Sequence, residues 1–173
     1  VIVGLIRDAT GGSITEGEDV FGNKYSTTNS DIYEIIDGKA RVLNSSSETH
    51  YTTLDGGIVA TKGGVTYKYS TKEEPYINPE NKRKGIGVII GADGENVTIG
   101  EDVFGNKYTT TTTNTYVVIN GQAKVDVATS ITDSANLDGS ISHVKGTTKY
   151  NYTDGTEDSS TLSPEYVKKG KVI

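Results

Sequence analysis

Apolar and polar residues alternate along several short stretches of this chain, which is the spacing of β-strands with two different faces. The segment Val65–Tyr69 places its three apolar side chains on one face. Asp31–Ile36 and Lys39–Leu43 flank the dipeptide Asp37-Gly38. This dipeptide, Asn120-Gly121 and Gly22-Asn23 are typical of two-residue hairpin turns. No segment shows a sustained apolar period of 3.6 residues. The pattern therefore predicts an all-β chain with tight turns.

A long internal repeat dominates the sequence. The string GEDVFGNKY occupies Gly17–Tyr25 and recurs unchanged at Gly100–Tyr108, an offset of 83 residues. At this one offset, and without a gap, close to half of the positions between Gly4 and Tyr69 match their counterparts. A duplication of this length implies that both halves share one fold.

Each half has the length and the expected strand number, six or seven, of a small immunoglobulin-like β-sandwich. We therefore expect two tandem sandwich modules, residues 1–83 and 84–173, divided at a polar stretch that contains Pro79. One pseudo-symmetric β-sandwich built from both halves is the alternative. Phe21 and Phe104 are the only two phenylalanines, and each is expected to anchor the core of its module.

Composition narrows the function further. The 173 residues carry a net charge of −6 and lack a large basic cluster, which argues against a nucleic-acid partner. No apolar run approaches the roughly 18 residues of a membrane span. Cysteine is absent, so disulfides do not stabilise the fold. Methionine is also absent and the chain starts at Val1, which we interpret as removal of a signal peptide and an extracellular or cell-surface location.

The two ends of the sequence predict a means of assembly. By the repeat offset, both ends fall within the segment that joins the two halves. The chain is then either an excerpt from a longer array or a subunit that polymerises head to tail by β-strand exchange. A third reading makes the first residues a strand of their own module. The residues of the expected assembly strand are Val1, Ile2, Val3, Leu5, Ile6, Val172 and Ile173.

Catalytic motifs are missing from the sequence, and the two histidines do not occupy equivalent repeat positions. We do not expect an enzyme. The one cofactor that the acidic loops suggest is calcium, which prefers oxygen ligands. Candidate ligands in the repeated motif are Glu18, Asp19, Glu101 and Asp102. The alternative is that these acids are exposed turn residues.

Repeated tyrosines raise a second functional hypothesis. Tyr67, Tyr69, Tyr150 and Tyr152 could form aromatic platforms for sugars, or they could pack on cross-strand neighbours. The function expected first is a structural subunit of an extracellular filament, pilus, sheath or surface layer, with copies of itself as partners in a homopolymer. The alternative is an adhesin stalk or carbohydrate-binding module from a longer repeat protein, with a glycan or host-surface ligand.

Overall fold

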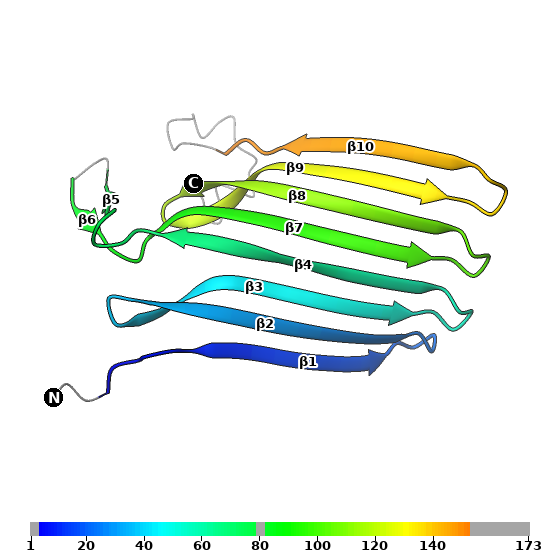
Figure 1. Cartoon of the computed structure of the whole chain (residues 1–173), viewed down its shortest axis with the longest axis horizontal. Helices are drawn as coiled ribbons and strands as arrows, with labels where there is room; N and C mark the ends of the chain where they lie inside the picture. Colours follow the sequence, from blue (N-terminus) through cyan, green and yellow to red (C-terminus); the bar gives the residue numbers. More distant parts are fainter. Residues whose placement is uncertain (1–3, 79–81, 153–173) are drawn as a thin grey trace, which may run out of the picture.

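The computed structural model of the chain (Figure 1) describes residues 4–78 and 82–152, and these residues form strands, turns and connecting segments. The strands are β1 (Thr10–Glu18), β2 (Lys24–Ile36), β3 (Lys39–Thr52), β4 (Ile58–Tyr69), β5 (Tyr76–Ile77), β6 (Lys84–Gly85), β7 (Ile89–Glu101), β8 (Lys107–Ile119), β9 (Gln122–Ala135) and β10 (Ile141–Lys149). The prediction of an all-β chain is confirmed.

Eight of these strands form one antiparallel sheet in the order β1-β2-β3-β4-β7-β8-β9-β10. The short β5–β6 hairpin is an excursion between β4 and β7 (Figure 1). Two separate immunoglobulin-like sandwiches are not confirmed, because β4 of the first half pairs with β7 of the second half within the shared sheet. The alternative, one pseudo-symmetric β-sandwich, agrees with this topology in that both halves share one structure, but the described residues form a single large sheet and not two packed ones. The expected boundary at 83/84 falls at the start of β6 and stays a prediction.

The sheet reproduces the sequence repeat strand by strand. The bounds of β8 and β9 are those of β2 and β3 shifted by 83 residues. The register shift between Ile32 and Tyr33 recurs between Thr115 and Tyr116. Both β-bulges follow the same sequence position, so the duplicated sequence specifies the irregularities of the strands as well as the strands themselves.

The hairpin turns follow from residues that tolerate positive φ angles. Asp37 and Gly38 have φ of 50° and 73°, and Asn120 and Gly121 have 52° and 74°. A two-residue turn with two positive φ angles matches the right-handed twist of the flanking strands. The hairpins predicted at these two dipeptides are therefore confirmed. The motif containing Gly22 forms a longer loop instead of the two-residue turn expected from the sequence.

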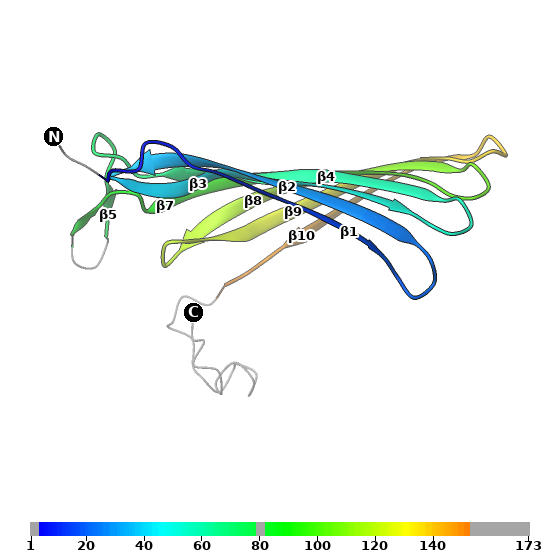
Figure 2. The same ribbon diagram turned by 90° about the horizontal axis from the view of Figure 1, so that it is seen from below.

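Very few side chains are buried. Among the described residues, the buried apolar side chains are Ile36 and Ala92, each 8% exposed. Ser70 is fully buried, and its hydroxyl donates to the Gly85 carbonyl and accepts from the Val88 N–H, both at 3.0 Å. This small core lies where the chain leaves β4 for the β5–β6 hairpin. The rest of the sheet is one twisted layer (Figure 2).

The prediction that Phe21 and Phe104 anchor a core is wrong. Phe21 is 76% exposed and Phe104 is 74% exposed. Both lie in the loops that join β1 to β2 and β7 to β8, beyond the strand ends. No second layer covers these loops in the described part of the chain, so a large apolar side chain there remains in contact with solvent.

Candidate assembly interface

Two strand edges of the large sheet are open in the part of the chain that the structure describes. There, β1 pairs with β2 only, and β10 pairs with β9 only. An outer strand presents a row of unpaired backbone N–H and C=O groups, which is a surface that can pair with another strand. These two edges lie on opposite sides of the sheet (Figure 1).

Opposite charges distinguish the two edges. β1 contains Glu16 and Glu18 and has no basic residue. β10 contains His143, Lys145 and Lys149 and has no acidic residue. An acidic strand and a basic strand attract each other, whereas two copies of either strand repel. The edges are therefore electrostatically suited to each other.

The junction of β4 with β7 shows how the two repeats join inside one chain. Ile58 lies opposite Glu101 at one end of the pair, and the register continues without a break to Lys68 opposite Gly91. Near its middle the Thr61 and Thr98 side-chain oxygens are 3.0 Å apart. One repeat is thus continued by the next through ordinary antiparallel ladder pairing.

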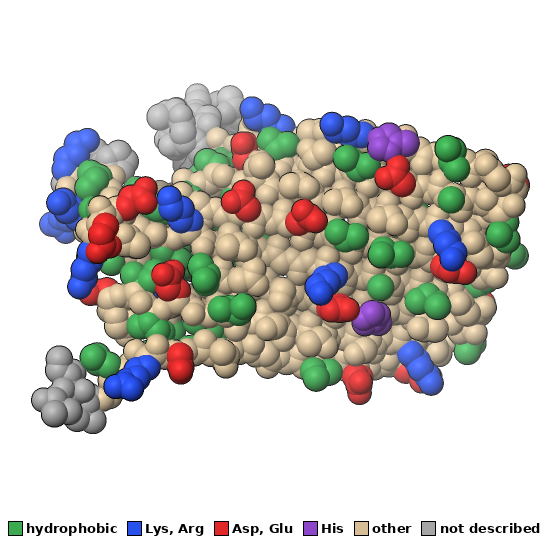
Figure 3. All heavy atoms as spheres, in the orientation of Figure 1, with side chains coloured by type: hydrophobic (Ala, Val, Ile, Leu, Met, Phe, Trp, Pro, Cys, Tyr) green, Lys and Arg blue, Asp and Glu red, His purple; other side chains and the backbone are tan. Residues whose placement is uncertain are grey.

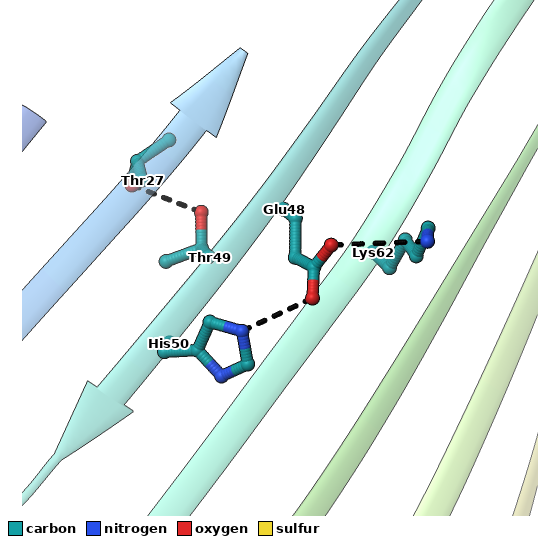
Figure 4. Close-up of polar contacts among 5 residues, drawn as sticks. All are labelled: Thr27, Glu48, Thr49, His50 and Lys62. Carbon is teal, nitrogen blue, oxygen red and sulfur yellow. Dashed lines mark hydrogen bonds and ion pairs between the residues drawn. The ribbon is translucent and has the colours of Figure 1, made fainter. Parts of the chain in front are cut away.

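One face of the sheet carries nearly all of its charge. On it, Glu48 accepts a hydrogen bond from His50 at 3.1 Å and pairs with Lys62 at 3.7 Å (Figure 4). A further pair joins His143 to Asp133 at 2.6 Å. All of these side chains are largely exposed, so each pair contributes little to stability. Figure 3 shows this face, with its ion pairs scattered over a mainly uncharged surface.

The opposite face has a row of threonines across the sheet. Successive cross-strand partners in the ladder continue this row over seven neighbouring strands. Three of its pairs have side-chain oxygens within 3.0 Å of each other, which adds side-chain hydrogen bonds to the backbone ladder. The members are Thr15, Thr27, Thr49, Thr61, Thr98, Thr110 and Thr132.

In the repeated acidic motif, the two aspartate carboxylates accept hydrogen bonds from residues of their own loops. The Asp19 carboxylate accepts from the backbone N–H groups of Phe21 (2.8 Å) and Asn23 (3.1 Å) and from the Asn23 side-chain amide (2.9 Å). Asp102 repeats these bonds with Phe104 and Asn106. The side-chain amide bond, together with the backbone bonds, lowers the pKa of both aspartates. Each aspartate therefore organises its loop.

The two glutamates of the motif, Glu18 and Glu101, have different surroundings from the two aspartates. Glu101 pairs with Lys107 at 3.3 Å across the β7–β8 hairpin, and Glu18 lies on the open β1 strand. Within the described residues, no group of three or more His, Cys, Asp or Glu side chains is placed to hold a metal ion. Calcium binding at the motif stays a prediction.

Of the four predicted sugar-binding tyrosines, Tyr67, Tyr69 and Tyr152 are half-buried, and Tyr150 is exposed. The Tyr69 hydroxyl donates to the Val42 carbonyl at 2.8 Å, and Tyr152 donates to the Val125 carbonyl at 2.7 Å. Burial raises the pKa of the Tyr69 hydroxyl. Tyr67 lies beside Tyr69, with ring centroids 6.5 Å apart and a tilt of 43°. Tyr150 is 45% exposed. Tyr67 and Tyr69 are therefore tilted relative to each other and not coplanar, and sugar binding stays a prediction.

The expected assembly strand is described only in part. Leu5 and Ile6 are 60% and 46% exposed and precede the first strand of the sheet. Val1, Ile2, Val3, Val172 and Ile173 lie outside the described residues. Strand exchange through these ends stays a prediction, and the open edges of β1 and β10 are a second route to assembly that sequence reasoning missed. The offset of 83, applied to strand order, was the signal that could have found it.

No family model, curated protein or solved structure matches this chain. Within the described ranges, no helix has the length and apolar character needed to cross a membrane. Inferences about function therefore rest on the geometry of the sheet and on the charge of its edges.

Proposed function

We propose that this chain is a structural subunit of an extracellular filament, sheath or surface layer, in which copies join edge to edge through β1 and β10. The observation that carries the proposal is the β4–β7 junction, where one repeat already continues another by strand pairing. Repetition of the same contact between chains would extend the sheet without a change in either subunit.

The small core supports the proposal. A single antiparallel layer with two buried apolar side chains gains little from the hydrophobic effect, which dominates the stability of most domains. Pairing of an outer strand with a neighbour satisfies its backbone groups and gives its side chains cross-strand neighbours to pack against. Assembly would therefore contribute stability that a lone copy lacks.

The edges also lack most of the features that keep outer strands apart. Natural edge strands are often short, bulged or interrupted by proline. Here β1 and β10 each run for nine residues without proline, and their ladders show no register shift. Lys145 and Lys149 would discourage pairing of β10 with a second β10, but they favour an acidic partner.

Extracellular location is part of the proposal on grounds of composition. The chain is rich in Thr, Ser and Gly, and it has neither cysteine nor methionine. Oxidation therefore has no sulfur atom to attack in an exposed polymer. Surface protease treatment of intact source cells would release fragments of the chain if the location is correct.

The test is sedimentation and negative-stain microscopy of the purified chain over a range of concentrations. We expect particles that lengthen with concentration at low salt. Lys145→Glu would place an acid on β10 and shift the population toward monomers. Lys39→Glu makes the same change of charge on the interior strand β3, where residue 39 lies opposite Ile36, and should assemble like the wild type. A folded chain that stays monomeric at every concentration would contradict the proposal and favour a stalk or sugar-binding module.

A further inference from the structure

A glycine in β10 has no explanation within the described chain. Gly146 is not among the glycines with positive φ, and a Cβ built on it would meet no atom within 4 Å. A glycine inside a strand weakens it and often marks a close approach of another backbone. Gly63 holds the equivalent position in β4 and has such a reason. A Cβ there would lie 2.8 Å from the Glu95 carbonyl oxygen of β7 and would overlap the Asn96 side chain.

The repeat relates both open edges to this internal junction. β10 corresponds to β4 and β1 corresponds to β7 at the offset of 83. Ile58 opposite Glu101 therefore translates to Ile141 opposite Glu18, which is the same pair of residue types. The open edge of β10 is thus the repeat counterpart of the β4 edge that pairs with β7.

We propose that β10 of one copy pairs antiparallel with β1 of a second copy in the register of the β4–β7 junction. Ile141 then lies opposite Glu18, and Lys149 lies opposite Thr10. This inference rests on the proposed function and specifies its joint. The partner is a second copy of this chain, whose Ser13 lies opposite Gly146 as Asn96 lies opposite Gly63 in the internal junction.

Side chains on the charged face suit this register. His143 lies opposite Glu16, and Lys145 lies opposite Ile14 with Glu16 as its diagonal neighbour. The internal junction has Lys62 opposite Val97, again a lysine facing a β-branched aliphatic side chain. Opposite charges on neighbouring strands attract, so Glu16 favours the placement of Lys145 in this register. Pairing of β1 with a second β1 would bring Glu16 and Glu18 of two chains together.

Small side chains fill the other face of the joint. Val144 would face Thr15, Gly146 would face Ser13, and Thr148 would face Gly11. The internal junction likewise sets one glycine against a larger partner, with Gly63 opposite Asn96 and Gly94 opposite Val65. The pairs alternate in size in the same manner at both places, so the joint repeats the size pattern of the internal junction.

Cysteine cross-linking tests the register, because the chain has no native cysteine. Thr15→Cys and Val144→Cys chains are purified separately, mixed and oxidised mildly. Directly opposite residues have Cα atoms within disulfide reach. We expect the mixture to shift from the mass of one chain, 18.4 kDa, to that of two. Ile14→Cys with Lys145→Cys tests the neighbouring pair of the same register.

Three controls make the outcome decisive. Thr61→Cys with Thr98→Cys in one chain should close the equivalent internal pair and shows that oxidation works. Thr15→Cys mixed with Ser142→Cys is offset by two residues, about 7–8 Å between Cα atoms, and should not cross-link. Dimers of Thr15→Cys alone would indicate pairing of β1 with β1 and would overturn the proposal.

The result also separates this inference from the proposed function. Wild-type particles together with cross-links at Thr15 and Val144 support both. Particles without these cross-links, or with cross-links only in the offset pair, overturn the register and leave edge assembly in place. Monomers with no cross-link overturn both.

Discussion

Thr61 and Thr98 lie directly opposite each other across the junction of the two repeats, with their side-chain oxygens 3.0 Å apart. The same contact joins Thr27 to Thr49 and its repeat copy, Thr110 to Thr132. The same threonine hydrogen bond thus occurs within each repeat and between the two repeats. The threonine row therefore crosses the junction between the repeats without interruption.

We predict that the Thr61–Thr98 bond stabilises the junction measurably. Replacement of both residues by valine keeps the shape and removes the hydroxyls. A double-mutant cycle in chemical denaturation should give a coupling free energy of about 0.5–1 kcal/mol. A cycle with Thr61→Val and Thr113→Val joins residues that are not partners and should give a coupling near zero. Equal values from the two cycles would contradict the prediction.

Glycines at equivalent repeat positions should differ in their tolerance of a methyl group. Gly63→Ala forces a Cβ against the Glu95 carbonyl oxygen and should lower the free energy of unfolding by about 1–3 kcal/mol. Gly146→Ala adds the same group in open space and should change it by no more than about 0.5 kcal/mol. Denaturation of dilute protein measures both. A large loss at Gly146 in the monomer would show that β10 has a further intramolecular partner.

The loop aspartates should make the fold sensitive to acid. Hydrogen bonds lower the pKa of Asp19 and Asp102 below the ordinary value of 3.8, so their stabilising effect is present above that value. It is lost as the pH falls through the lowered pKa of the folded state. Thermal unfolding as a function of pH should show a steeper acid decline for the wild type than for Asp19→Asn/Asp102→Asn.

The double asparagine variant should also be less stable at neutral pH, because a neutral amide accepts the loop hydrogen bonds more weakly than a carboxylate does. Asp31→Asn, which removes an acid with no resolved loop bonds, serves as the matched control. Parallel pH curves for the wild type and the double variant would contradict the prediction.

Phenylalanine substitution should have little effect on stability. Phe21→Ser and Phe104→Ser remove exposed side chains and should change the free energy of unfolding by about 0.5 kcal/mol or less. Ile36→Ala removes part of the small core and should cost about 2 kcal/mol or more. Chemical denaturation of all three variants ranks the sites by their loss of unfolding free energy. Equal losses at Phe21 and Ile36 would mean that the loop is covered.

The sequence predicts local features of this fold well. The type of turn at Asp37-Gly38 follows from residues that accept positive φ, and the strand over Tyr108–Thr115 follows from β-branched side chains. The alternation in Val65–Tyr69 correctly places Val65, Tyr67 and Tyr69 on the less exposed face of β4. All of these features depend on interactions within or between adjacent segments, which a repeat sequence specifies twice.

The arrangement of strands into a single open layer could not be predicted in the same way. Alternation shows that a strand has two faces, but it does not show what covers either face. Phe21 and Phe104 suggested a core because large apolar side chains are usually buried. Their position in loops beyond the strand ends leaves them exposed, and the pairing of β4 with β7 depends on a connection through the β5–β6 hairpin that the alternation does not specify.

The twist of the sheet has a consequence for any array built from it. Adjacent strands rotate by about 20–25° relative to each other, so the four main strands of one repeat turn the sheet by about 80–100°. With strands about 4.8 Å apart, a complete turn takes about four repeats and a rise of about 75 Å. Figure 2 shows the beginning of this rotation in the fanning of the strands. A long array would be a helical ribbon with a pitch set by the repeat, and the charged face would wind around it as a continuous stripe.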